Sequence, residues 1–107
     1  MRMVYICHPL AKPSVEENIK ITRKIVQDII NTEGSSILPL SPQLYFPQIL
    51  DDGKSEDRNL GMEYAMYFLR RSDEVWVYGD VISEEMKKEL EEASGLKIPI
   101  RFFEVPQ

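Results

Sequence analysis

Short apolar runs alternate along this chain with longer segments of helical periodicity, and this alternation constrains the fold more than any other feature. Strand-like runs lie near residues 3–7, 36–40, 74–78 and 98–103. The first, MVYIC, shows no polar alternation, as expected of a strand covered on both faces. The order β-α-β-α-β-α-β predicts a small doubly wound α/β domain, with a four-stranded parallel sheet flanked by helices.

The first helical segment, residues 14–31, carries apolar side chains at helical spacing. Ser14 is placed to cap this helix, and Glu17, three residues later, predicts a capping box. Gly34 is placed to end it. We therefore predict a capped helix between the first two strands.

A long polar and aromatic connection, residues 43–57, follows the second strand and is expected to contain a helical turn. The second helix is expected to begin at Asp57 and Arg58. The third is expected to be capped by Ser83 and stopped by Gly95.

The composition excludes several classes of function. Of 107 residues, 18 are acidic and 13 basic, and the net charge of -5 argues against binding a nucleic acid polymer. One cysteine and one histidine supply neither an internal disulfide nor the ligands of a zinc site, so we expect no metal and no cofactor. No apolar run approaches the ~20 residues of a membrane span, and the N-terminal segment lacks the apolar core of a signal peptide. We therefore expect a cytoplasmic protein without membrane association.

Ligands of doubly wound sheets bind beyond the carboxyl ends of the strands. In this chain the loops after Cys7, Leu40 and Gly79 mark that end of the sheet. If the first strand lies between the second and the third, the first and last of these loops adjoin. His8 and Ser83 should then line one cavity.

Glu89 is the most unusual charged residue of the third helix. Helical spacing puts Met86, Leu90 and Ala93 on one inward stripe, with Glu89 at its edge. The alternative is a carboxylate that snorkels to the surface. Glu85 lies one turn earlier, and such like-charge crowding tends to raise the pKa of a carboxyl group.

Other polar groups are expected at the same mouth. Gly79 and Asp80 follow the third strand, and Ser83 opens the helix, so backbone N–H groups and a hydroxyl converge there. The alternative role for Ser83 is simple capping. His8 directly follows the first strand, although a lone histidine is more often structural or exposed.

The second loop and second helix supply four further candidates. Tyr45 and Phe46 offer surfaces on which a planar ring could stack, although such aromatics more commonly pack in a core. Asp57 is placed as a helix cap, whereas Arg58 lacks the usual electrostatic reason for lying at a helix start.

The segments VYICHP, EENI, LPLSPQLYFPQILDD, EDRNLGMEYAM, SDEVWVYGD and ISEEMKKELEEA resemble the small DUF4406-type proteins of bacteria and phages. That group is similar to the nucleoside 2-deoxyribosyltransferases and the deoxynucleoside 5'-monophosphate N-glycosidases. The resemblance implies one flavodoxin-like domain over residues 1–107, with a glutamate nucleophile on a helix. By position that nucleophile is Glu89. The motif of the relatives is matched here by Gly79, Ser83, Met86, Glu89 and Ala93.

The activity implied is cleavage or transfer of an N-glycosidic bond of a (deoxy)nucleoside or its monophosphate. Glu89 would attack the anomeric carbon, and Asp57 or Asp80 would assist the leaving base or orient Glu89. The resemblance further implies that the segment from Cys7 to Leu10, with His8 and Pro9, lines the pocket. The alternative from another class is a non-catalytic protein that senses a nucleotide or nucleoside derivative.

Two expectations concern assembly and substrate. We expect a homodimer, because Tyr64, Tyr67 and Phe68, with Tyr45 nearby, exceed what one helix face can bury. Glu85 stands where the relatives usually carry glycine, and a carboxylate there would repel a substrate phosphate. We therefore expect a preference for an unphosphorylated ligand, unless Glu85 turns outward.

Overall fold

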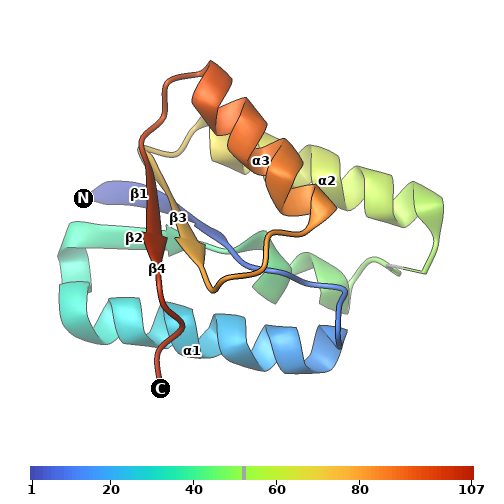
Figure 1. Ribbon diagram of the computed structural model, residues 1–107, viewed down its shortest axis with the longest axis horizontal. Helices are drawn as coiled ribbons and strands as arrows, with labels where there is room; N and C mark the ends of the chain where they lie inside the picture. The colour runs from blue at the N-terminus through green and yellow to red at the C-terminus, as the bar shows by residue number, and fades with distance from the viewer. Residues whose placement is uncertain (52) are drawn as a thin grey trace.

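The computed structural model describes residues 1–51 and 53–107 and has a four-stranded parallel sheet between two helical layers (Figure 1). Asp52, part of the polar stretch before the second helix, lies outside the described residues. The principal elements are β1 (Arg2–Cys7), α1 (Val15–Glu33), β2 (Ile37–Leu40), α2 (Ser55–Arg70), β3 (Glu74–Tyr78), α3 (Glu84–Gly95) and β4 (Ile100–Phe103). Short 3-10 turns lie between some of these elements: η1 (Gly34–Ser36), η2 (Pro42–Leu44) and η3 (Phe46–Gln48).

The strand order is β2-β1-β3-β4, and every neighbouring pair is parallel. Tyr5 of β1 pairs with Leu40 of β2 and with Val75 of β3. The predicted doubly wound fold is therefore confirmed, including the position of the first strand between the second and third. As a consequence, the loops after β1 and β3 lie next to each other.

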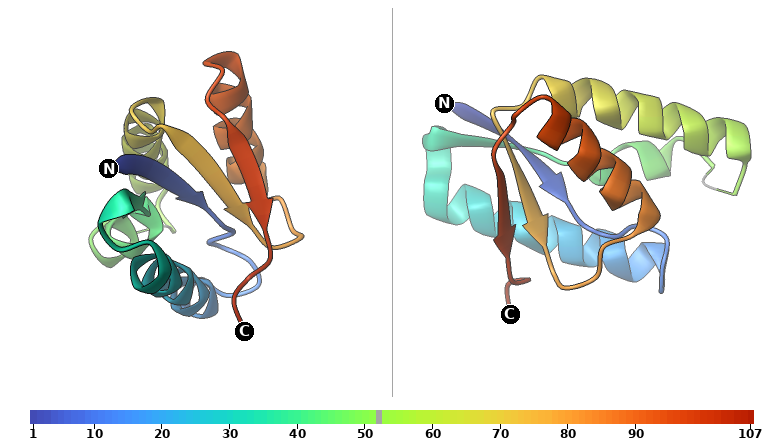
Figure 2. Two further views of the ribbon diagram at one scale, coloured as in Figure 1. Left: turned by 90° about the vertical axis from the view of Figure 1, so that its left-hand side faces the viewer. Right: turned by 45° about the horizontal axis from the view of Figure 1, so that its top comes forward.

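The alternating side chains of the central strands form two cores, one on each face of the sheet. Figure 2 shows α1 on one face and α2 with α3 on the other. Tyr5, Cys7, Val75 and Val77 pack toward α2 and α3, where Leu69 is fully buried. Replacing a buried leucine of this kind by alanine lowers the free energy of unfolding by about 2–5 kcal/mol. The opposite core is formed by Val4, Ile6, Ile25, Ile29, Ile37, Trp76 and Tyr78.

Both predicted serine caps are present. The Ser14 hydroxyl accepts a hydrogen bond from the Glu17 N–H at 3.3 Å. The Glu17 carboxylate pairs with Lys20 and does not bond back to the Ser14 N–H, so the predicted capping box is only half formed. Gly34 ends α1 with φ 52°, a conformation that glycine adopts without strain. Ser83 accepts from the Met86 N–H at 3.2 Å and fixes the start of α3.

The strand and helix bounds differ from expectation by a few residues. β4 begins at Ile100 instead of residue 98, and α2 begins at Ser55, before Asp57. The predicted turn in the long connection is present as η2 and η3. Among the helices of the described residues, none is both long enough and apolar enough to cross a bilayer.

Candidate active site

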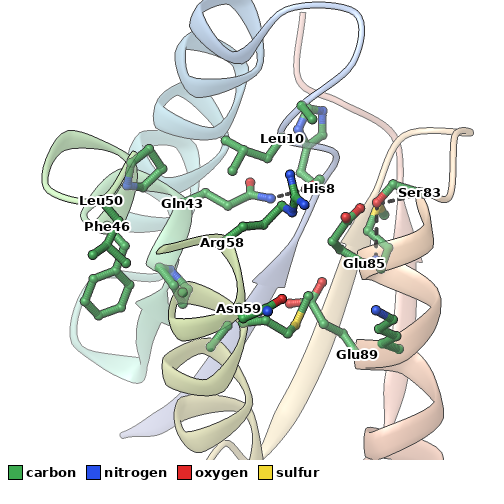
Figure 3. A pocket seen from close by; sticks show the side chains of 18 of the residues that line it. His8, Leu10, Gln43, Phe46, Leu50, Arg58, Asn59, Ser83, Glu85 and Glu89 are labelled. Atoms are coloured by element: carbon green, nitrogen blue, oxygen red, sulfur yellow. Dashed lines mark hydrogen bonds between the residues drawn. The ribbon is translucent and has the colours of Figure 1, made fainter. Parts of the chain in front are cut away.

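A cavity of about 440 Å³ opens beyond the carboxyl ends of β1, β2 and β3 (Figure 3). Its walls come from the segment after β1, from η2 and η3, from the first turns of α2 and from the first half of α3. The residues that line it include Tyr5, His8, Gln43, Phe46, Asp57, Arg58, Ser83, Glu85, Met86 and Glu89. His8 and Ser83 thus line one cavity, as expected.

Glu89 is a buried carboxylate in this wall. Its exposed fraction is 7%, similar to those of Met86 (1%) and Ala93 (0%), so it lies within the buried stripe of α3 and not at its edge. The snorkelling alternative is therefore wrong. The Tyr5 hydroxyl donates to Glu89 Oε2, and Cys7 Sγ lies 3.5 Å from Glu89 Oε1. Neutral donors from β1 therefore hold both carboxylate oxygens.

The electrostatics of the site follow from this burial. The pKa of Glu89 is raised from 4.5 to about 7, chiefly because the buried carboxylate loses its hydration. The hydrogen bonds from Tyr5 and Cys7 oppose the rise, and the nearby Glu85 carboxylate adds to it. Burial and the Glu89 charge also raise the pKa values of the Tyr5 phenol and the Cys7 thiol. Both groups therefore remain protonated at neutral pH and can act as donors.

The segment after β1 is held by a buried amide. Asn18 of α1 is 4% exposed, and its Nδ2 donates to the carbonyl oxygens of Leu10, at 2.9 Å, and Lys12, at 2.8 Å. These bonds satisfy backbone groups that a loop next to a core would otherwise leave unpaired. The position of His8 at the cavity wall is thereby fixed from α1.

A second amide links this segment to η2. Gln43 Nε2 donates to the His8 carbonyl oxygen, and Gln43 Oε1 lies 3.2 Å from the Thr22 hydroxyl. Thr22 Oγ1 is also 3.5 Å from His8 Nδ1. The loops after β1 and β2 are therefore joined by side chains as well as by the sheet.

The start of α2 and the start of α3 face each other across the cavity. Asp57 Oδ2 accepts from the Asp51 N–H at 2.7 Å, so this carboxylate orders the turn before α2. Arg58 and Glu85 also line the cavity, and Figure 3 shows the Glu85 side chain directed into it. The alternative in which Glu85 turns outward is therefore wrong. Ser83 caps α3 and also lines the cavity, so its two predicted roles coexist.

Four of the predicted site residues are not among those that line the cavity. Pro9 is buried, and Asp80 is exposed. Tyr45 is 60% exposed and packs its ring against Phe46, which does line the cavity. Gly79 has φ 89° and donates its N–H to the Phe103 carbonyl at 3.0 Å, so it ends β3 and shapes the turn toward α3.

The partners of Glu89 were not identified from the sequence. Tyr5 and Cys7 are two residues apart on β1, and side chains at that spacing point to the same face of a strand. This alternation was the available signal, but it does not specify which helix lies opposite. Gln43, Asn18 and Thr22 gave no comparable signal. Among the described residues, no group of three or more His, Cys, Asp or Glu side chains could hold a metal ion.

The fold and the cavity together define a parallel α/β protein with a buried carboxylate beyond the carboxyl end of its sheet. The chain belongs to the family described as a domain of unknown function, DUF7768, whose profile matches residues 2–103. The named family therefore differs from the DUF4406-type group that the sequence resembles.

Six chains of solved structures match this fold. One is the 2-deoxyribosyltransferase from the psychrotolerant bacterium Bacillus psychrosaccharolyticus, described as a biocatalyst for the synthesis of nucleosides. The alignment has a TM-score of 0.67 and 15% sequence identity, and it covers 95% of this chain and 72% of that chain. At this identity the likeness shows a shared fold. No match was found among curated proteins.

Proposed function

We propose that this protein cleaves or transfers the N-glycosidic bond of a (deoxy)nucleoside or its monophosphate, with Glu89 as the nucleophile. The observation that carries the proposal is the burial of the Glu89 carboxylate in a cavity wall, between neutral donors. Ionising a carboxylate in such a place costs free energy, and groups that carry this cost gather at functional sites. The deoxyribosyltransferase fold supports the same reaction class.

The proposed reaction forms one bond and breaks another at the same carbon. A lone pair of Glu89 attacks the anomeric carbon as the bond from that carbon to the base nitrogen breaks, and the departing base takes up that electron pair and a proton from water. Water then attacks the same carbon, the bond from that carbon to Glu89 breaks with its electron pair returning to the carboxylate, and the proton lost by the attacking water goes to solvent. In transfer, a second base attacks in place of water. The chain would thus act as a hydrolase or as a transferase.

Tyr5 and Cys7 have a defined part in this scheme. Their hydrogen bonds lower the pKa of Glu89 relative to burial alone, which increases the fraction of carboxylate at neutral pH. They also fix the direction of the carboxylate, so that its remaining lone pairs meet the sugar. Asp57, which lines the same cavity, is the proposed group that assists the leaving base.

The cavity is of suitable size for one nucleoside. Its volume of about 440 Å³ falls in the range of small-molecule sites, roughly 300–1,000 Å³. Phe46 contributes an apolar part of the wall, and its ring packs against those of Tyr64 and Phe68. The net charge of -5 remains consistent with a small ligand in place of a nucleic acid polymer.

The test is the release of free base, measured by chromatography after incubation with each common 2'-deoxynucleoside and its 5'-monophosphate. The wild type is expected to release base, and Glu89→Gln is expected to release none. Glu91→Gln removes the same charge from an exposed position of α3 and should retain activity. Adding a second base separates transfer from hydrolysis. Ligand-induced stabilisation without base release would instead support a nucleotide sensor.

A further inference from the structure

His8 is a buried side chain of the cavity wall that the proposed chemistry does not use. Its exposed fraction is 5%. One ring nitrogen, Nδ1, lies 2.9 Å from the Pro9 carbonyl oxygen and 3.5 Å from Thr22 Oγ1. Within residues 1–51 and 53–107, the other nitrogen, Nε2, has no hydrogen-bond partner.

The contact with Pro9 determines which nitrogen carries the proton. A carbonyl oxygen only accepts, so a hydrogen bond of 2.9 Å requires a proton on His8 Nδ1. Thr22 agrees with this arrangement, because its hydroxyl donates to the Asn18 carbonyl at 2.9 Å and can accept from the ring. Burial lowers the pKa of His8, so the ring is neutral at pH 7. Nε2 is therefore a hydrogen-bond acceptor.

The position of Nε2 is equally constrained. In the part of the chain that the structure describes, Ser41 Oγ is the one side-chain polar atom that is both sealed from solvent and unpaired. Nε2 is not one of these sealed atoms, and His8 is one of the residues that line the cavity. The Gln43 bond to the His8 carbonyl holds the backbone there.

We propose that His8 Nε2 accepts a hydrogen bond from the bound nucleoside and selects ligands that present an N–H or O–H group at that point. The donor is the exocyclic amine of the base or a hydroxyl of the sugar. A carbonyl or phosphate oxygen there would meet the nitrogen lone pair and be rejected. The inference rests on the proposed function only in taking the cavity as the nucleoside site.

Calorimetry with matched ligands tests this selection. The measurements use the Glu89→Gln background, which prevents turnover. 2'-Deoxyadenosine is compared with purine 2'-deoxyriboside, which lacks the amine, and with the 2',3'- and 2',5'-dideoxyadenosines, which each lack one hydroxyl. Deoxycytidine is compared with 2-pyrimidinone 2'-deoxyriboside in the same way. Loss of one donor should weaken binding by roughly 2- to 13-fold, and adding His8→Phe should abolish that difference.

The possible results separate the two proposals. Equal affinity across all pairs, a difference that persists with His8→Phe, or failure of every compound to bind would overturn the role of His8. The glycosidase proposal fails in a separate measurement, if the wild type releases no free base. A donor preference at His8 would stand in that case.

Nitrogen NMR gives a second test that needs no variant. The sequence has one histidine, so its imidazole ¹⁵N resonances are assigned without mutagenesis. At pH 7 in the free protein, Nδ1 should carry the proton and Nε2 should show the resonance of an unprotonated nitrogen. That resonance should move when a donor ligand binds. The opposite tautomer, or no movement on binding, would contradict the proposal.

Discussion

Replacing Glu89 by glutamine is expected to remove one specific pH dependence of the protein's stability. Burial raises the pKa of Glu89 from 4.5 to about 7 in the folded protein. Between these pH values the folded protein holds a proton that the unfolded chain has released. The free energy of unfolding therefore falls as pH rises.

The size of this effect follows from the two pKa values. A tenfold change in proton affinity is worth about 1.4 kcal/mol, so a change from 4.5 to about 7 corresponds to about 3 kcal/mol. This stability is fully present below pH 4.5 and is lost as pH rises through about 7. Glutamine has the same size and can still accept from Tyr5, but it does not titrate. The stability of Glu89→Gln relative to wild type should therefore increase by about 3 kcal/mol between pH 4.5 and 8.

Urea unfolding at closely spaced pH values measures this difference, because contributions of the other groups largely cancel between the two proteins. Glu91→Gln on the exposed side of α3 serves as the matched control and should follow the wild type in parallel. Parallel curves for Glu89→Gln and wild type would refute the reasoning, since they would mean that Glu89 titrates alike in the folded and unfolded chains.

Three further predictions test the site and the surface. If Glu89 acts as a carboxylate, kcat/KM should fall as pH drops below a midpoint of about 7. Tyr5→Phe should move this midpoint upward, because the hydrogen bond from Tyr5 lowers the pKa of Glu89. An unmoved midpoint in the pH-rate profile would contradict this. Glu85→Gly should increase the affinity for a deoxynucleoside monophosphate by roughly fivefold more than the affinity for the nucleoside, because a close charge pair in water is worth about 1 kcal/mol. Equal changes of the two affinities, measured by calorimetry, would show that Glu85 does not sense the phosphate. Light scattering should show a homodimer, because Tyr64 and Tyr67 on α2 are 41% and 58% exposed and offer an apolar surface to a second copy. Tyr67→Glu should weaken this dimer. A wild-type monomer at high micromolar concentration would contradict the interface.

The fold was predictable because each element is specified locally. The continuous apolar runs of β1 and β3 require cover on both faces, and the intervening helices supply it. The ends of elements were less certain where no side chain marks them. α2 begins after Lys54, which makes no side-chain cap, so the sequence contained no signal for that start.

The site was predictable only as far as local periodicity reaches. Helical spacing placed Glu89 near the buried face of α3, and the end of β1 placed His8 at the mouth of the sheet. The pairing of Glu89 with Tyr5 joins residues 84 positions apart, and it depends on how α3 crosses β1. Spacing within one element carries no information about that crossing. The same limit hid Gln43, whose amide joins two loops.

The burial of Glu89 is the point where local and global preferences of this chain conflict. The rest of α3 follows ordinary rules, with a serine cap, apolar side chains inward and charges outward. A carboxylate in the inward stripe weakens the folded state by about 3 kcal/mol once it ionises, because its pKa is displaced from 4.5 to about 7. Folding alone favours a neutral side chain at that position. A cost of this kind is expected at a functional site, and here it falls on the residue that faces the cavity.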